Sequence, residues 1–233
     1  MTNELDKAVI VDFPLRGERW VAVNTPGDRV PSHGTDMLGQ RFAYDLLKVD
    51  ARGPGFRYHP AGILRGVFIG VRTRDCYAWG AEIHAPFEGE VVAAADGVAE
   101  RGWIHPLREL ILVLKNSVTF SPARVPALLG NHVIMRRGEV FAAFGHLAPG
   151  SVAVAPGQAV RNGDVLGRVG HTGNSTSPHL HFQLMDSADP MHARGVPCAF
   201  RTYEVTRNGS WEKVKNGIPR KVDRIRYLGP TGS

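Results

Sequence analysis

Short apolar runs, broken by turn residues, repeat along most of this chain. Glycine, proline, asparagine or aspartate separates the runs at short intervals, and helical periodicity is hard to find. This pattern predicts a mainly β fold with little helix, an antiparallel sandwich or barrel. The predicted strands are residues 20–23, 42–47, 67–71, 90–94, 110–114, 132–135, 140–145, 165–169 and 179–184.

The strand rhythm divides the chain into three stretches. Residues 1–66 form an irregular N-terminal segment, and residues 67–185 hold the regular alternation of strands and turns. Residues 101–129 interrupt that alternation as an insertion that borders a site or forms a long hairpin without a role. Residues 186–233 form a C-terminal extension with strand-like runs at 200–206 and 225–228.

Two segments, 85–92 and 154–167, resemble each other: in each, a turn with proline or Pro-Gly is followed by a strand. The second also contains Asn162-Gly163, a favoured two-residue hairpin turn because both residues tolerate positive φ. Hammerhead sandwiches of the lipoyl and biotinyl type use the same arrangement. The sequence therefore favours a sandwich core of that kind.

The stretch Pro178-His179-Leu180-His181-Phe182 carries the clearest candidate chemistry. Alternate side chains of a strand share a face, so His179 and His181 would point one way and Leu180 and Phe182 the other. Two imidazoles on one face can hold a metal, or hold a metal and transfer protons beside it. Ordinary hydrogen-bonded histidines give the same pattern, so partners elsewhere must decide.

Three further residues are candidate partners. His146 ends the apolar run 141–145 just before a turn, a place from which a ring can face a cleft. His33 lies in a turn-forming segment, and Asp45 is embedded in the apolar run 42–47. Burying a carboxylate costs several kcal/mol unless it is paired or metal-bound, so Asp45 indicates either a structural ion pair or a ligand. Imidazoles with one carboxylate match the three-ligand pattern of catalytic zinc.

Composition limits the function classes. The chain has 233 residues, is 43% hydrophobic and carries a formal net charge of +6, which suits a globular protein with a real core. The charge is spread out, and no stripe of interleaved basic and aromatic residues indicates nucleic-acid binding. Two cysteines, Cys76 and Cys198, exclude a cysteine zinc knuckle and leave free thiols or one bridge open.

No run approaches the ~20 apolar residues of a membrane helix, and residues 1–16 lack the features of a signal peptide. As written, the chain reads as cytoplasmic; it would be secreted or periplasmic if a leader had been removed.

Five segments share a recognisable pattern: 77–80 with 83–86 and Gly89, 130–134, 144–147, 160–167, and 170–176 running into 178–182. Together they make the chain similar to the lysostaphin-type (LytM-like) zinc endopeptidases. The resemblance covers roughly residues 30 to 185, and its most specific part is the tandem of the last two segments.

The resemblance implies a β-sandwich with a groove whose floor is a sheet. It implies one Zn²⁺ per chain, held by His33, Asp45 and His181, with His146 and His179 as catalytic histidines that do not bind the metal. In better-known members the first histidine and the aspartate lie closer together than the twelve positions found here. The sequence around Asp45 resembles a branch of the family with a longer loop between the two ligands. Asp36, in a turn three residues after His33, is the alternative ligand.

The expected function is that of a zinc-dependent endopeptidase acting on glycine- or alanine-containing bonds of peptidoglycan peptides. A non-catalytic binding or regulatory relative is one alternative, although all five family positions are filled here. A lipoyl-type carrier is another, but the Asn162-Gly163 turn carries no lysine to modify. A phosphocarrier with paired histidines would leave Asp45 unexplained. Oligomeric state and the cleaved bond stay open.

Overall fold

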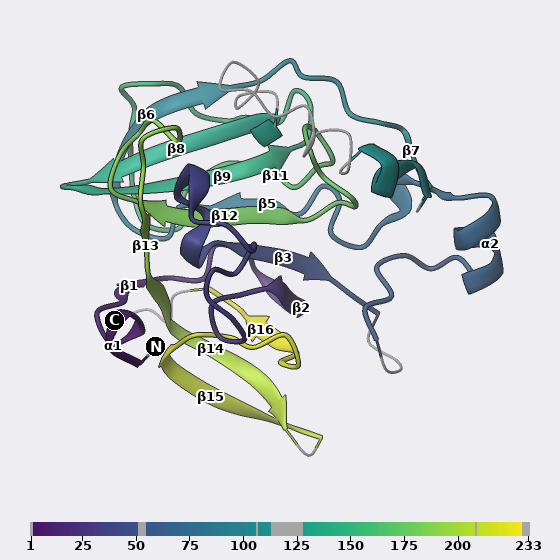
Figure 1. The fold of residues 1–233 in the computed structure, drawn as a ribbon, viewed down its shortest axis with the longest axis horizontal. Coiled ribbons are helices and arrows are strands. Elements are labelled where there is room, and N and C mark those ends of the chain that lie inside the picture. The colour runs from purple at the N-terminus through teal and green to yellow at the C-terminus, as the bar shows by residue number, and fades with distance from the viewer. Residues whose placement is uncertain (1, 51–54, 106, 113–127, 208, 230–233) are drawn as a thin grey trace.

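The computed structural model describes residues 2–50, 55–105, 107–112, 128–207 and 209–229. Strands dominate, most of them antiparallel, and the helices are short (Figure 1), which confirms the predicted fold class. The helical elements are α1 (Thr2–Leu5), η1 (Met37–Phe42), α2 (Ile63–Phe68), η2 (Thr73–Asp75) and a turn of helix at residues 107–112. None of the helices in these ranges is long and apolar enough to span a membrane.

The strands form one large sheet and two small ones. The large sheet has twelve strands in the order β1-β14-β16-β2-β3-β12-β9-β8-β6-β10, with β13 beside β12 and β15 beside β14. The strands are β1 (Val9–Val11), β2 (Gly17–Asn24), β3 (Tyr44–Lys48), β4 (Val71–Arg72), β5 (Glu82–His84), β6 (Gly89–Ala95), β7 (Trp103–Ile104), β8 (Asn131–Arg137), β9 (Val140–Leu147), β10 (Ala159–Val160), β11 (Val165–Arg168), β12 (Leu180–Met185), β13 (Gly195–Val196), β14 (Cys198–Arg207), β15 (Ser210–Gly217) and β16 (Ile225–Tyr227).

The small sheets pair β5 with β11 and β4 with β7. β1 pairs in parallel with β14, whereas the other pairings in the described ranges are antiparallel. The large sheet takes strands from all three stretches distinguished in the sequence, and the boundaries at residues 66 and 185 stay predictions.

The two faces of the large sheet differ in chemistry. Leu180 and Phe182 of β12 point to the inner face, where they join the main hydrophobic core together with Phe144 of β9. Residues of β5 and β11 belong to the same core and cover that face. Burial of each large apolar side chain contributes about 1.5–3 kcal/mol. The alternate residues, His181 and Gln183, point to the outer face, so the candidate chemistry lies on the sheet rather than inside the core.

Two predicted strands are wrong. Residues 63–68 form α2 where a strand was expected over 67–71, and only Val71 and Arg72 are extended, as β4. Residues 107–112 are helical where a strand was expected over 110–114, and residues 113 and 114 lie outside the described ranges. Glu109 donates its backbone N–H to His105 O at 3.0 Å, a helical i to i−4 bond. The periodicity of a short apolar run does not distinguish a helix from a strand, and both of these runs include helical residues.

The expected hairpin at Asn162-Gly163 is also wrong. The turn exists, with Gly163 at φ +89° and the Asp164 N–H donating to Arg161 O at 3.1 Å. However, β10 before it pairs with β6, and β11 after it pairs with β5. The chain therefore crosses here from the large sheet to the small covering sheet.

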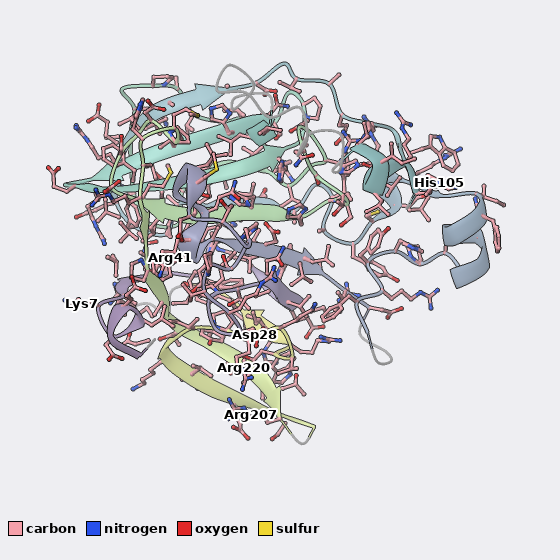
Figure 2. All side chains as sticks on the ribbon, viewed as in Figure 1. Lys7, Asp28, Arg41, His105, Arg207 and Arg220 are labelled. Carbon is pink, nitrogen blue, oxygen red and sulfur yellow. The ribbon has the colours of Figure 1, made fainter. Side chains whose placement is uncertain are left out.

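The C-terminal extension continues the large sheet. β14 and β16 pair with each other, and β16 pairs with β2. Arg220 Nε lies 3.3 Å from Asp28 Oδ1, an ion pair that ties the extension to the N-terminal part (Figure 2). Cys76 and Cys198 are both free thiols and both buried.

The Asp96 carboxylate accepts hydrogen bonds from the loop that follows β9, beyond His146. Its Oδ1 accepts the Gly150 N–H at 2.9 Å, and its Oδ2 accepts the Val152 N–H at 3.2 Å. Burial would raise the pKa of this carboxyl, but its backbone hydrogen bonds outweigh that effect and lower it. The carboxylate therefore stabilises the fold above the unfolded-state pKa of about 4, and this contribution is lost as the pH falls through the lower folded-state pKa.

Asp96→Asn is expected to destabilise the fold by about 1 kcal/mol at pH 7, because an amide presents only one oxygen to the loop. The melting temperature should fall by about 2–4 °C, and the difference from the unsubstituted chain should vanish toward pH 3. Thermal melts across pH check this. Glu212→Gln, which breaks an exposed pair with Arg207, is the control and should change little; an equal loss at pH 3 and pH 7 would contradict the assignment.

Candidate active site

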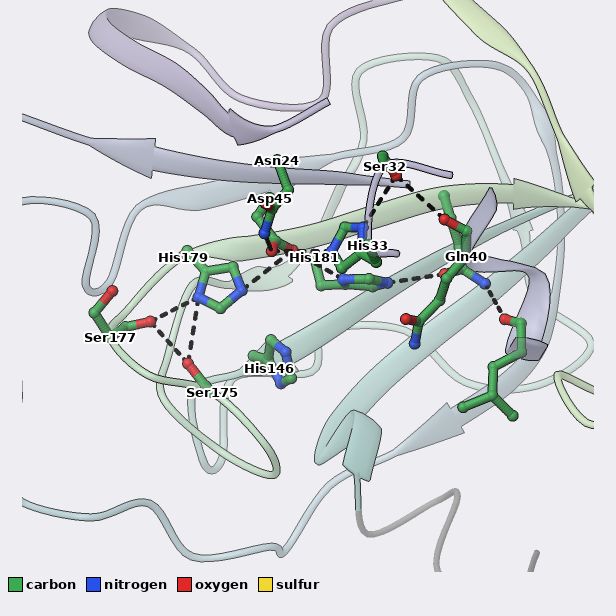
Figure 3. A network of polar contacts seen from close by, with 12 residues as sticks. Asn24, Ser32, His33, Gln40, Asp45, His146, Ser175, Ser177, His179 and His181 are labelled. Atoms are coloured by element: carbon green, nitrogen blue, oxygen red, sulfur yellow. Dashed lines mark hydrogen bonds and ion pairs between the residues drawn. The ribbon is translucent and has the colours of Figure 1, made fainter. Parts of the chain in front are cut away.

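A cavity of about 260 Å³ opens on the outer face of the large sheet. All five residues singled out in the sequence line it: His33, Asp45, His146, His179 and His181. They come from four separate parts of the chain, and the fold brings them together (Figure 3).

The pairing of β12 with β3 and β9 sets the centre of this cavity. His181 lies directly opposite Asp45 of β3 on one side and Gly145 of β9 on the other. A Cβ built at Gly145 would lie 3.5 Å from the His181 Cβ, an ordinary van der Waals contact. His179, just before β12 begins, lies on the same face as His181, as strand alternation predicted.

A β-bulge turns His146 toward the cavity. Phe144 faces the core, so regular alternation would point His146 to the core as well. Instead, Phe144 pairs with Val133 and Leu147 with Asn131, so β9 carries one more residue than β8 across this interval. His146 has φ +66°, an uncommon conformation for a residue with a Cβ. The extra residue and the reversed dihedral re-aim the ring at the cavity.

His33 and Asp45 meet although they are twelve positions apart in the sequence. His33 Nε2 lies 3.0 Å from Asp45 Oδ2, and His181 Nδ1 lies 2.9 Å from Asp45 Oδ1. Asp36, the rival ligand, is in an exposed ion pair with Arg41 at 2.6 Å and does not line the cavity. The geometry thus groups Asp45, and not Asp36, with the histidines.

Hydrogen bonds on the far side of each ring assign its protonated nitrogen. His146 Nδ1 lies 2.9 Å from Thr172 O, and His179 Nδ1 lies 2.7 Å from Ser177 O. Because a carbonyl oxygen only accepts, both Nδ1 atoms carry the hydrogen. Both Nε2 atoms are therefore unprotonated in the neutral rings.

The same reasoning applies to the two histidines that contact Asp45. Gln183 donates its amide N–H to Leu38 O at 2.8 Å, which turns its Oε1 to the His181 Nε2–H, also at 2.8 Å. Ser32 Oγ donates to Gln40 O at 3.2 Å and so accepts the His33 Nδ1–H at 3.1 Å. His181 Nδ1 and His33 Nε2, the atoms that face Asp45, are then acceptors.

These three side chains fit a metal ion. Their inward atoms all lie within 4.8 Å of one another, and each is an acceptor when the rings are neutral. Acceptors facing a carboxylate at about 3 Å repel one another unless a cation or protons lie between them. Two imidazole nitrogens and one carboxylate oxygen, each held from behind, are a donor set that zinc favours.

The surroundings shift the pKa values of the site in opposite directions. Burial would raise the pKa of Asp45, but electrostatic attraction to His33 and His179 outweighs burial and holds that pKa well below its usual range. Burial, aided by His179 and His181, lowers the pKa of His146 well below its usual range. For His179, burial also lowers the pKa, but attraction to Asp45 outweighs it and the net shift is upward.

Three supporting residues, Asn24, Ser32 and Gln183, were not predicted from the sequence. Asn24 of β2 donates to Asp45 Oδ2 at 2.6 Å, which a bulge in the β2–β3 pairing makes possible. Ser32 and Gln183 orient His33 and His181. Gln183 had a signal, because it is two residues beyond His181 on the same strand and therefore shares its face.

Comparison with known proteins agrees with the family resemblance seen in the sequence. The model of peptidase family M23 matches residues 76–193, a range that includes His146, His179 and His181. The chain is 38% identical over 107 residues to the DD-carboxypeptidase/endopeptidase Mpg of Neisseria meningitidis serogroup B, covering 45% of this chain and 24% of that protein. It is 28% identical over 191 residues to lysostaphin of Staphylococcus staphylolyticus, covering 77% of this chain and 33% of that one.

Among solved structures, the catalytic domain of lysostaphin from Staphylococcus simulans aligns at 20% identity and a TM-score of 0.31, covering 60% of this chain and 86% of that one. The chain spans a quarter to a third of the length of the two curated relatives. The family model matches half of the chain, and three of the five candidate residues lie inside the match. On that match, the chain belongs to peptidase family M23.

Proposed function

We propose that this chain is a zinc-dependent endopeptidase that hydrolyses glycine- or alanine-type bonds of peptidoglycan peptides. The observation that carries the proposal is the set of facing acceptors: His33, Asp45 and His181 meet with no hydrogen assigned between them when the rings are neutral. His33, Asp45 and His181 would hold one Zn²⁺. A zinc ion bound there would polarise the scissile carbonyl and lower the pKa of a bound water to about 7.

The other two histidines would move protons. His146 and His179 present unprotonated Nε2 atoms toward the cavity, and their ring centroids are 4.9 Å apart. Either ring can take the proton of the attacking water and later give it to the leaving amine. His179 Nε2 also lies 3.4 Å from Asp45 Oδ1, so the carboxylate stabilises the ring once it is protonated. A protonated ring can also donate a hydrogen bond to the developing oxyanion.

The glycine- or alanine-type bond in this proposal comes from the family resemblance. The cavity supplies apolar walls beside the histidines, with Leu38, Leu129 and Pro190 among its lining residues. The curated relatives support the polymer: one is named a peptidoglycan DD-endopeptidase, ShyA of Vibrio cholerae, 35% identical over 65 residues.

Hydrolysis of purified muropeptides tests the proposal. The full chain loaded with zinc is expected to cleave a peptide bond in them, with mass spectrometry identifying the new termini, and chelation should abolish the reaction until zinc is restored. Asp45→Asn should be inactive and Asp36→Asn active, which makes the two acids a matched pair. Hydrolysis that survives chelation, or equal activity of the two variants, would overturn the zinc mechanism.

A further inference from the structure

Arg101 and Glu109 form an ion pair behind the loop that leads into β12, outside the cavity. Arg101 Nη2 lies 2.9 Å from Glu109 Oε2, and Arg101 Nε donates to Glu109 Oε1 at 3.3 Å. The Glu109 side chain is 2% exposed and the Arg101 side chain 21% exposed. Removing both charges from water costs several kcal/mol, so a net gain in stability does not by itself explain the pair.

Arg101 uses its remaining N–H groups on the loop. It donates to Gly173 O at 3.2 Å and to Ser175 O at 2.6 Å, and its Nη2 lies 3.1 Å from His171 Nε2. A guanidinium can only donate, so His171 Nε2 must accept. The hydrogen of His171 is then on Nδ1.

Further hydrogen bonds connect His171 to His179 along the loop. His171 Nδ1 lies 3.0 Å from Ser175 Oγ, which accepts its hydrogen. Ser175 Oγ donates in turn to Ser177 O at 2.7 Å, and the same carbonyl accepts the His179 Nδ1–H at 2.7 Å (Figure 3). His171 and Ser175 are 0% and 2% exposed, so these bonds are shielded from bulk water.

We propose that Arg101, held in place by Glu109, is a positioning residue for hydrolysis. It holds the loop at residues 171–177 through Gly173 O, Ser175 O and His171 Nε2. It therefore keeps the Ser177 carbonyl where it accepts the His179 Nδ1–H, which aims the His179 Nε2 at the cavity. The inference rests on the proposed function, because it assigns proton transfer to His179. Burial and the charge of Arg101 lower the pKa of His171 to about 3, which agrees with a neutral ring.

Histidine nitrogen NMR on the ¹⁵N-labelled full chain tests the arrangement without substrate or metal. The expected spectrum has His171 protonated at Nδ1 and unprotonated at Nε2, and His179 protonated at Nδ1. In Arg101→Lys the compact ammonium cannot reach the same acceptors, so the His171 tautomer should change and the His179 Nδ1 proton should exchange faster. A His171 ring protonated at Nε2 in the unsubstituted chain would overturn the proposal.

Kinetics supply the second readout. Arg101→Lys and Ser175→Ala should each lower kcat by about 10–100-fold, the usual cost of losing a residue that orients an active group, while KM and zinc content stay near those of the unsubstituted chain. Ser175→Ala leaves the Arg101–Glu109 pair intact, so it serves if Arg101→Lys fails to fold. The matched control is Arg136→Lys, which alters an exposed Arg–Glu pair with Glu90.

The outcomes separate the two proposals. Both variants with the kcat and the His179 spectrum of the unsubstituted chain would overturn the positioning role. If no muropeptide is cleaved by any form of the protein, the proposed function fails, and the NMR result still decides whether Arg101 holds the loop that orients His179.

Discussion

His181→Ala is expected to remove stoichiometric zinc from the chain and, with it, hydrolysis of muropeptides. His181 supplies Nδ1 to the three-residue cluster, and Gln183 holds its other nitrogen at 2.8 Å. Losing a residue that only orients a ligand costs about 10–100-fold in metal affinity, so losing the ligand itself should cost more. Metal analysis after dialysis should find about one zinc per chain in the unsubstituted protein and almost none in the variant.

The surface histidine His192 offers the control for this substitution. Its side chain is 83% exposed and pairs with Asp189 at 2.6 Å, and it is not among the residues that line the cavity. His192→Ala should keep both zinc and activity. Zinc should also raise the melting temperature of the unsubstituted chain and of His192→Ala, but not that of His181→Ala. A chain that binds no zinc and melts identically with and without His181 would contradict the metal site.

The fold could be predicted where alternation was strict. In β12, Leu180 and Phe182 share the core face and His181 and Gln183 share the other, as period two predicts. α2 and the helix at 107–112 could not be predicted, because a short apolar run fits either a helix or a strand. The pairing after Asn162-Gly163 could not be predicted either, because a turn fixes the local chain reversal but not which sheet the next strand joins.

The site shows a similar division. The shared face of His179 and His181 follows from their spacing, and the geometry around Asp45 follows from a register that no local pattern encodes. His146 reaches the cavity only through a bulge and a positive φ, so alternation alone would have placed its ring in the core. Its position before a turn was the usable signal. Asn24 had none, because its contact depends on a second bulge, in the pairing of β2 with β3.

His146→Ala is expected to separate zinc binding from catalysis. No atom of His146 belongs to the cluster formed by His33, Asp45 and His181, so the variant should bind zinc as the unsubstituted chain does. Its Nε2 faces the cavity unprotonated, and removing a general acid or base lowers kcat by about 10²–10⁴-fold. Because the lost group acts during the reaction and is not assigned a contact with the bound peptide before it, KM should change little.

The measurement pairs metal analysis with steady-state kinetics on one muropeptide, beside His181→Ala, which should lose both properties. His146→Gly adds a structural check, since glycine adopts φ +66° freely and alanine does not. The free energy of unfolding of the glycine variant should therefore be about 1 kcal/mol higher than that of the alanine variant, while the two variants should have the same low kcat. A variant at position 146 that loses zinc would make this histidine a ligand, and one that keeps full kcat would remove it from the chemistry, leaving His179 as the proton carrier.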